Sequence, residues 1–270
     1  MHPQQRQNPC HIKGFQGTSL IDYPGRIASI LFTGGCNFRC RYCYNRSLLT
    51  VTELPDLDVD MILATLKTRR NFIEGVVVTG GEPTLHPGLI DLLCAIRRIG
   101  LDVKLDTNGT HPEILEWIIE DNLAEYIAMD YKAPLNKLED VACIRGAEKR
   151  VAASAHLLMA RAKRYEFRTT VHPLLHTRED LFEIAEELGG ARSWHLQQFH
   201  AVDPLDPALR DTAPYPAAFI LAIGDLLKPR FGKFSVRNLR DTGAGAHGSA
   251  PGDPGGASPQ NPSHMNFETH

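Results

Sequence analysis

Three of the six cysteines of this chain lie within eight consecutive positions, as Cys36, Cys40 and Cys43. Thiolates on one tight loop can each hold one iron of a [4Fe–4S] cluster, which leaves the last iron open to another ligand. Two alternatives remain: a zinc site completed by a histidine such as His11, and three unrelated core cysteines. Structural zinc sites usually take ligands in two separated pairs, and no second cysteine pair follows here. The spacing therefore favours the cluster.

The remaining cysteines are scattered along the chain, and one of them falls within an apolar helical pattern. We expect them to pack in the core or to lie at the surface; they are Cys10, Cys94 and Cys143. Three histidines are likewise expected to be structural or solvated: His172, His176 and His195.

A second motif, Thr79-Gly80-Gly81-Glu82-Pro83, follows a predicted strand. Glycines let a backbone approach a ligand closely, and the Glu82 carboxylate can accept hydrogen bonds from an ammonium group. Taken alone, Gly-Gly-Glu-Pro is a common turn. The cysteine loop also follows a predicted strand, and ligands of α/β proteins bind at the C-terminal edge of the sheet. We therefore expect the two motifs to share one site.

Short β-rich apolar runs alternate with helical patterns along most of the chain. The predicted strands are Ile27–Thr33, Gly75–Thr79, Leu101–Thr107, Glu125–Asp130, Glu166–Val171 and Ser193–Phe199, with a weaker one at Lys233–Arg237. Helical stripes are expected after Asp56 and Asp58, from Pro87, and from Leu181 up to Gly189–Gly190. This alternation predicts an α/β fold with a parallel sheet and right-handed crossovers. Six units are fewer than a full eightfold barrel needs, so we expect a partial (β/α)6 barrel.

Composition narrows the class of protein further. Hydrophobic residues make up 43% of the 270 residues and the formal net charge is −3, so the basic surplus of a nucleic-acid-binding protein is missing. The first twenty residues are polar and lack the apolar core that a signal peptide would need, and no apolar run approaches the roughly 20 residues that span a bilayer. We therefore expect a cytoplasmic protein that binds neither membrane nor nucleic acid, and whose reduced thiols serve as metal ligands.

The two ends of the chain differ in composition from the middle. From Asp241 onward there is no Leu, Ile or Val, and Gly, Pro and Ser are abundant. Such a segment buries too little apolar surface to offset its ordering entropy. The sequence thus predicts a flexible N-terminus at 1–11, one domain at 12–240 and a disordered tail at 241–270.

The motifs together resemble those of the radical S-adenosylmethionine enzymes. Cys36-x3-Cys40-x2-Cys43 has an aromatic residue, Tyr42, before its last cysteine, and Gly80-Gly81-Glu82 follows. In that family, S-adenosylmethionine chelates the open iron through its amino and carboxylate groups, and the Gly-Gly-Glu segment binds the methionine ammonium. The resemblance implies that the cosubstrate supplies the ligand that the cysteine loop lacks.

Residues 12 to 240 are similar, more narrowly, to the activating proteins of anaerobic ribonucleoside-triphosphate reductases, which are relatives of pyruvate formate-lyase activating enzyme. The similarity lies in GFQGTSLIDYPGRIASILFTGGCNFRCRYCYN and AMDYKAP. It implies that a flavodoxin or ferredoxin reduces the cluster. Cleavage of S-adenosylmethionine then gives a 5′-deoxyadenosyl radical, which takes the Cα hydrogen of a glycine on a glycyl radical enzyme.

The same resemblance implies roles for individual residues. Asp22, in Asp22-Tyr23-Pro24-Gly25, matches a position near the target peptide. A monovalent cation is implied beside the S-adenosylmethionine carboxylate, at Asp106, Thr107, the Ala128 backbone and Asp130. The residues implied at the cofactor are Tyr42, Gly80, Gly81, Glu82, Asp106, Asn108, Asp130, Lys132, Arg168 and His200. Simpler interpretations exist, because Asp106 and Asn108 can cap the next helix, Asp130 and Lys132 can form a surface pair, and His200 can be structural.

The chain also departs from the family. Close relatives commonly have histidine directly after the third cysteine, where this chain has Tyr44. The ferredoxin-like insertion of some activases and the C-terminal cysteine cluster of peptide-maturing relatives are missing from the sequence. Two alternative functions stay open: a small-molecule enzyme such as 7-carboxy-7-deazaguanine synthase, and a non-enzymatic zinc-binding interaction module.

Overall fold

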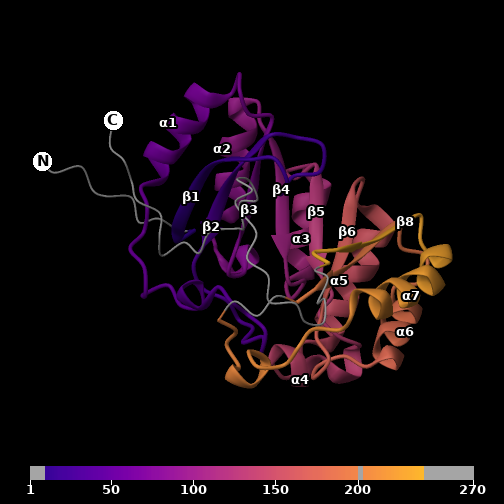
Figure 1. The fold of residues 1–270 in the computed structure, drawn as a ribbon. Helices are drawn as coiled ribbons and strands as arrows, with labels where there is room; N and C mark the ends of the chain where they lie inside the picture. The colour runs from indigo at the N-terminus through magenta and orange to yellow at the C-terminus, as the bar shows by residue number, and fades with distance from the viewer. Residues whose placement is uncertain (1–9, 200–202, 240–270) are drawn as a thin grey trace, which may run out of the picture.

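The computed structural model describes residues 10–199 and 203–239 of the chain (Figure 1). The predicted tail at 241–270, most of the predicted flexible N-terminus and His200 lie outside the described residues. Among the described residues, no helix is long and apolar enough to cross a membrane.

One sheet of eight strands, ordered β1 to β8 as in the sequence, organises the described residues. Strands β2 to β8 are parallel, and β1 pairs antiparallel with β2. The strands are β1 (Ile12–Ser19), β2 (Ala28–Thr33), β3 (Gly75–Gly80), β4 (Asp102–Thr107), β5 (Tyr126–Asp130), β6 (Tyr165–Val171), β7 (Ser193–Gln198) and β8 (Lys233–Arg237). The α/β fold with a parallel sheet is thus confirmed, and the weakly patterned Lys233–Arg237 joins it as a further parallel strand.

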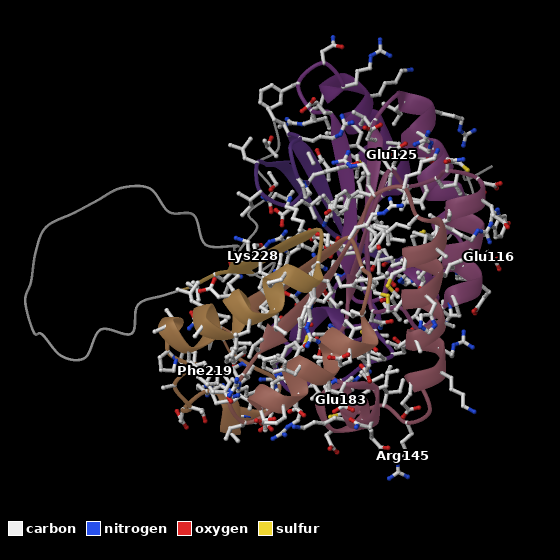
Figure 2. The ribbon with its side chains drawn as sticks, turned by 90° about the vertical axis from the view of Figure 1, so that its right-hand side faces the viewer. Glu116, Glu125, Arg145, Glu183, Phe219 and Lys228 are labelled. Atoms are coloured by element: carbon white, nitrogen blue, oxygen red, sulfur yellow. The ribbon has the colours of Figure 1, made fainter. Side chains whose placement is uncertain are left out.

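Helices connect successive parallel strands. The α-helices are α1 (Val59–Arg69), α2 (Leu89–Ile99), α3 (Pro112–Glu120), α4 (Leu138–Ala142), α5 (Glu148–Arg161), α6 (Arg178–Glu187) and α7 (Ala217–Leu227). Short 3-10 helices are η1 (Arg46–Leu48), η2 (Pro83–Leu85), η3 (Leu135–Lys137), η4 (Pro207–Leu209) and η5 (Lys228–Arg230). Figure 2 shows charged side chains of this helical side, such as Glu116 and Arg145, directed outward.

Local sequence signals explain where several helices begin and end. The Asp58 carboxylate accepts a hydrogen bond from the Met61 N–H, which caps α1 as the acidic start predicts. Thr177 and Asp180 form a capping box at the start of α6. Helix α2 begins at Leu89, two residues after the predicted Pro87.

Strand β1 was not predicted from the sequence. It contains Gly14 and Gly17 and lacks a regular alternation of apolar and polar residues, so neither β-propensity nor periodicity marks it. Its backbone pairs with β2 from Ile12 opposite Thr33 to Ser19 opposite Ala28, with register shifts between. The sheet therefore gains an antiparallel edge strand, as many mostly parallel sheets do.

The two faces of the sheet are covered differently. Val76 and Val78 of β3 belong to the large apolar core, which also includes residues of the helices. We term the face of the sheet that these side chains share the outer face. Val77 between them points to the opposite, inner face. There it joins a small apolar cluster made by Tyr23, Ala28, Ile30, Val77, Tyr126 and Ala128. In Figure 1, the loop between β1 and β2, which carries Tyr23, crosses this inner face.

Candidate active site

The cysteine loop leaves the C-terminal end of β2. Cys40 is buried, and Cys36 and Cys43 are half-buried. The Cys43 N–H donates to the Cys40 carbonyl at 2.9 Å, which gives the loop a tight turn. The Arg39 N–H donates to the Ala142 carbonyl at 2.9 Å and so attaches the loop to the end of α4. The backbone therefore fixes where the three thiols lie.

The three thiols lie close enough to influence one another. Burial is the main cause that raises the pKa of Cys36 to about 11 and that of Cys40 to about 12. The charges of Cys36 and Cys43 raise the pKa of Cys40 further, while Lys132 lowers it. Thiolates in such surroundings need the charge of a metal to stabilise them. Within 10–199 and 203–239, no three His, Cys, Asp or Glu side chains converge as ligands of one metal ion. Three thiols on one loop, each free to take its own iron, fit a cluster.

The other cysteines lie elsewhere in the fold. Cys94 packs on α2 beside the apolar core, and Cys10 is buried. Cys143 is exposed at the C-terminal end of α4. These positions agree with the expected packing and surface roles.

The Gly-Gly-Glu turn follows β3 and packs directly against the cysteine loop. The Glu82 N–H donates to the Gly35 carbonyl at 2.8 Å. A Cβ atom at Gly81 would lie 2.0 Å from that same carbonyl oxygen, and one at Gly80 would lie 2.5 Å from the Thr33 backbone. Gly80 also has φ +113°, which only glycine adopts readily. The two motifs therefore lie directly against each other, and the glycines are required by this close approach.

The Glu82 side chain is buried and faces the interior of the chain. Its carboxylate accepts hydrogen bonds from the Thr84 N–H at 3.1 Å, the Thr107 hydroxyl at 2.8 Å and the Asn108 N–H at 2.6 Å. Burial raises the pKa of Glu82, and these donors partly offset the rise. Glu82 thus joins the turn after β3 to the end of β4.

Two amide side chains connect the cysteine loop to the same end of β4. The Asn108 side-chain N–H donates to the side-chain amide oxygen of Asn37, Oδ1, at 2.8 Å. The Asn37 side-chain N–H donates to the Thr110 hydroxyl at 2.9 Å. Sequence reasoning missed Asn37, which lies between two cluster cysteines. No local signal could have found it, because its partners are 71 and 73 residues away.

Five charged side chains form a row across β4, β5 and β6 and the residues that follow β5, which we term the charged row. Its members are Lys104, Asp106, Arg168, Asp130 and Lys132. Arg168 stands at the centre, with Nη1 3.1 Å from Asp106 Oδ2 and Nε 2.8 Å from Asp130 Oδ1. Lys132 Nζ lies 3.2 Å from Asp130 Oδ2, and the Lys104 ammonium contacts Asp106 Oδ1. Positive and negative groups alternate along the row.

Neighbouring charges keep Asp130 and Lys132 ionised despite their burial. Burial works to raise the pKa of Asp130, but the Arg168 and Lys132 charges outweigh it and hold that pKa below its usual range. Burial likewise works to lower the pKa of Lys132, and the Asp130 charge outweighs it. The Lys132 ammonium also lies 5.7 Å from the centre of the Tyr42 ring, a cation–π distance.

Three histidines that the sequence leaves as structural or solvated are all buried: His172, His176 and His195. His176 pairs through Nε2 with the Lys132 carbonyl at 2.7 Å, and its Nδ1 accepts from the His172 N–H at 3.3 Å. Because Nδ1 is the acceptor, Nε2 carries the proton and donates it. His176 therefore fixes the backbone of Lys132, whose side chain contacts Asp130 in the charged row.

Asp22 lies in the exposed loop between β1 and β2. Its carboxylate accepts a hydrogen bond from the Ser19 hydroxyl at 2.5 Å. Partial burial of the phenol raises the pKa of Tyr44, and the charges that act on it include Arg168, Asp130 and Asp22. Tyr44 itself is exposed, directly after Cys43 in the cysteine loop.

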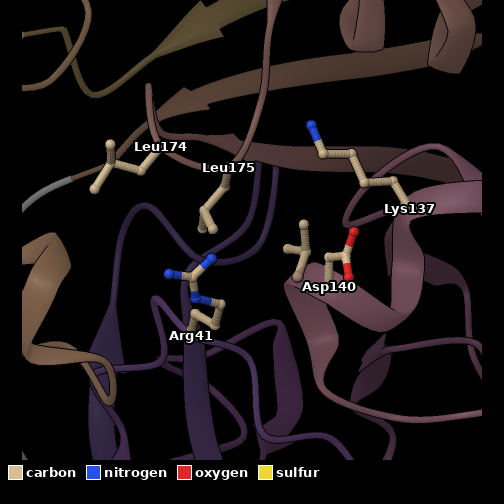
Figure 3. A pocket seen from close by; sticks show the side chains of 6 residues that line it. Arg41, Lys137, Asp140, Leu174 and Leu175 are labelled. Carbon is tan, nitrogen blue, oxygen red and sulfur yellow. The ribbon is translucent and has the colours of Figure 1, made fainter.

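A separate cavity of about 360 Å³ lies beside the cysteine loop (Figure 3). It is lined by Arg41, Lys137, Asp140, Val141, Leu174 and Leu175. The Arg41 guanidinium forms an ion pair with the Asp206 carboxylate, with Nη2 2.7 Å from Oδ2. This cavity contains no member of the charged row and is distinct from the site built by the two motifs.

Comparison with known proteins identifies the class. The sequence model of the Radical SAM superfamily matches residues 30–188, which is more than half of the chain. The chain therefore belongs to the radical SAM superfamily and is an enzyme that uses a [4Fe–4S] cluster and S-adenosylmethionine. The alternative of a non-enzymatic zinc-binding module is wrong.

Two kinds of curated relative are similar to the chain. The "Putative glycyl-radical enzyme activating enzyme" of Methanocaldococcus jannaschii is 28% identical over 243 residues, which cover 86% of this chain and 97% of that protein. The pyruvate formate-lyase-activating enzyme of Clostridium pasteurianum is 31% identical over 103 residues, which cover 36% of this chain and 43% of that enzyme.

Solved structures share the fold. A radical SAM methyltransferase from Sphaerobacter thermophilus superposes with a TM-score of 0.60 at 16% identity, over 80% of this chain and 67% of that one. Streptococcus suis SuiB bound to S-adenosylmethionine superposes with a TM-score of 0.58 at 14% identity, over 75% of this chain and 48% of that one. At these identities the likeness concerns the fold alone.

Proposed function

We propose that this protein installs a glycyl radical on an anaerobic ribonucleoside-triphosphate reductase. The observation that carries the proposal is the match to the "Putative glycyl-radical enzyme activating enzyme", because it extends over 86% of this chain and 97% of that protein. Little of that relative is left unmatched. The choice of a reductase as the partner rests on the segments around Asp22-Tyr23-Pro24-Gly25 and Asp130-Tyr131-Lys132.

The cysteine loop would hold the cluster, with Cys36, Cys40 and Cys43 each binding one iron. When bound, the cluster would supply the electron for reductive cleavage of S-adenosylmethionine to methionine and a 5′-deoxyadenosyl radical, which would take the Cα hydrogen of the partner's glycine. Lys132 and Arg168, both held cationic by Asp130, would offer charge-assisted hydrogen bonds to the carboxylate of the methionine moiety.

The Gly-Gly-Glu turn would present its backbone to the methionine ammonium. Gly80 and Gly81 allow this approach, and the buried Glu82 carboxylate keeps the turn attached to the end of β4. The remaining residues that we assign to the cofactor site are Tyr42, Asp106, Asn108, Asp130 and His200. All of these except His200, which is not described, lie around the C-terminal ends of β2, β4 and β5.

The partner's glycine loop would enter along the inner face of the sheet. Asp22 lies in the loop between β1 and β2, which crosses that face (Figure 1), and its exposed carboxylate can accept backbone N–H bonds from an extended peptide. Within the described part of the chain, the apolar cluster on this face contains no residue of a helix, whereas the core of the outer face includes the helices.

We further propose a flavodoxin or ferredoxin as the electron donor and the cytoplasm, where thiols stay reduced, as the compartment. The cysteine loop carries the exposed cations Arg39 and Arg46. Positive charge near the cluster is complementary to an acidic electron carrier and favours its productive encounter.

Electron paramagnetic resonance tests the proposal. A candidate anaerobic ribonucleoside-triphosphate reductase would be incubated anaerobically with the reconstituted protein, S-adenosylmethionine and reductant. We expect a glycyl radical doublet that disappears when the target glycine of the reductase is replaced by alanine. Cleavage of S-adenosylmethionine without any protein radical, accompanied by turnover of a small molecule such as a 7-deazaguanine precursor, would contradict it.

A further inference from the structure

Lys104 is a charged residue in the middle of a buried strand. It belongs to β4, its side chain is only 3% exposed, and its ammonium contacts Asp106 Oδ1. A buried ammonium is costly unless a counter-charge accompanies it. Neither the sequence motifs nor the proposed reaction assigns a role to Lys104.

Its partner Asp106 belongs to the set at which the family resemblance implies a monovalent cation. The described structure does not fit that cation, because cationic side chains already occupy the carboxylates. Asp106 is contacted by Lys104 on Oδ1 and by Arg168 on Oδ2. Asp130 is contacted by Arg168 on Oδ1 and by Lys132 on Oδ2.

Thr107, another member of the implied cation set, is also engaged, as are two neighbours of the set, Thr79 and Glu166. The Thr107 hydroxyl donates to Glu82 at 2.8 Å, and the Thr79 hydroxyl donates to Asp106 Oδ2 at 3.2 Å. The nearby carboxylate of Glu166 is paired with Arg237 at 2.9 Å. Three cationic groups thus face two carboxylates in the charged row, and an added metal cation would meet a net positive environment.

We propose that Lys104 is a built-in substitute for the monovalent cation, so that this protein binds S-adenosylmethionine without K⁺ or Na⁺. A tethered ammonium neutralises Asp106 without the loss of translational freedom that a diffusible ion would suffer on binding. Lys104 is accordingly a positioning residue: it acts on Asp106 and, through it, on the Arg168 guanidinium. The inference rests on the use of S-adenosylmethionine and not on which partner receives the radical.

The test measures the affinity for S-adenosylmethionine of the anaerobically reconstituted holoprotein, by equilibrium dialysis. Binding would be compared in KCl, in NaCl and in choline chloride at equal ionic strength. The wild-type dissociation constant should agree within about twofold across the three salts. Lys104→Met keeps most of the length of the side chain and removes its charge, so the affinity of this variant should fall about tenfold in choline chloride and recover in KCl or NaCl.

Lys67→Met, on the exposed surface of α1, serves as the matched control and should show no salt preference. Iron content and thermal stability would be measured on every protein. Loss of wild-type binding in choline chloride overturns the proposal, and this result needs no variant. A folded Lys104→Met protein whose affinity does not respond to K⁺ or Na⁺ also overturns it. Either failure leaves the glycyl radical assay unaffected, so the proposed function is tested separately.

Discussion

On the inner face of the sheet, strand β5 changes from apolar to charged over a few residues. On β5, Tyr126 and Ala128 belong to an apolar cluster closed by Tyr23, whereas Asp130, at the end of the strand, belongs to the charged row. On the neighbouring β6, Glu166 and Arg168 are both charged. The region around Tyr23 is therefore packed like a protein core. The charged row lies beside it, because Lys104 and Asp106 are in register with Tyr126 and Ala128 of the neighbouring strand. We term the first region the packed end and the second the functional end.

This difference separates stability from function. Burying the Tyr23 ring removes apolar area from water and stabilises the fold directly. Burying Asp130 and Arg168 costs desolvation free energy that their mutual attraction only roughly offsets. An array of this kind is weak evidence for stability and is better explained by the charges of a bound cosubstrate. Changes at the two ends should accordingly affect different measurements.

Removing a cluster ligand should have the largest effect at the functional end. Cys36→Ala, Cys40→Ala and Cys43→Ala should each abolish cluster assembly and reductive cleavage of S-adenosylmethionine, because each thiolate would hold its own iron. Iron content and 5′-deoxyadenosine yield measure this. Cys94→Ala is the control and should retain both, and loss of the cluster in a folded Cys94→Ala protein would show that the ligands are assigned wrongly.

At the packed end, Tyr23→Ala should lower the free energy of unfolding by about 3–5 kcal/mol, as is usual for truncating a fully buried aromatic ring. Cluster content per folded protein should stay unchanged. Tyr23→Phe removes only the long hydrogen bond from the hydroxyl to the Val103 carbonyl, at 3.4 Å, and should cost about 1 kcal/mol or less. Denaturant unfolding gives both values. A large loss of cluster at unchanged stability would contradict the division between the two ends.

The histidine behind the charged row predicts a pH dependence. Burial lowers the pKa of His176 from 6.5 to about 4, so folding favours the neutral ring. The contribution of the neutral His176 ring to the free energy of unfolding is complete above pH 6.5 and is lost as the pH falls towards 4. Between pH 7.5 and pH 4.5, the wild-type unfolding free energy should fall about 2–3 kcal/mol more than that of His176→Gln. Parallel pH curves for the two proteins would show that His176 does not carry this dependence.

The smallest predicted effect separates recognition of the partner from cofactor chemistry. Asp22→Ala should lower the yield of glycyl radical about tenfold. One charge-assisted hydrogen bond to the partner peptide can contribute about 1.5–3 kcal/mol, and a loss of about 1.4 kcal/mol already corresponds to a factor of ten in binding. Cleavage of S-adenosylmethionine without the partner should remain near the wild-type rate. The alternative is that Asp22 serves only its bond to Ser19. In that case both yields and the thermal stability would fall together.

Much of the fold could be predicted from the sequence because the parallel strands are apolar runs of the expected length. The bounds of β2 to β8 agree with the predicted ranges within one residue. Strand β1 could not be found, since Gly14, Gln16 and Gly17 interrupt the pattern of a buried strand and antiparallel pairing with β2 supplies its stability.

The site could be predicted in part. The cysteine loop and the Gly-Gly-Glu turn were placed at one edge by the rule for parallel sheets, and the bond from the Glu82 N–H to the Gly35 carbonyl confirms that placement. Lys104 and Asn37 were missed. Asn37 binds residues on another strand end, and Lys104 is recognisable only once Asp106 and Arg168 are seen beside it. Local periodicity carries no information about such contacts.

Mössbauer spectroscopy of the protein reconstituted with ⁵⁷Fe tests the central claim most directly, namely that three cysteines leave one iron open for the cosubstrate. The spectrum would be recorded with and without S-adenosylmethionine. The account predicts a [4Fe–4S] cluster in which one iron changes its isomer shift when S-adenosylmethionine is added, in the wild type and in Cys94→Ala alike. A cluster whose irons all remain unchanged on addition of S-adenosylmethionine would contradict it.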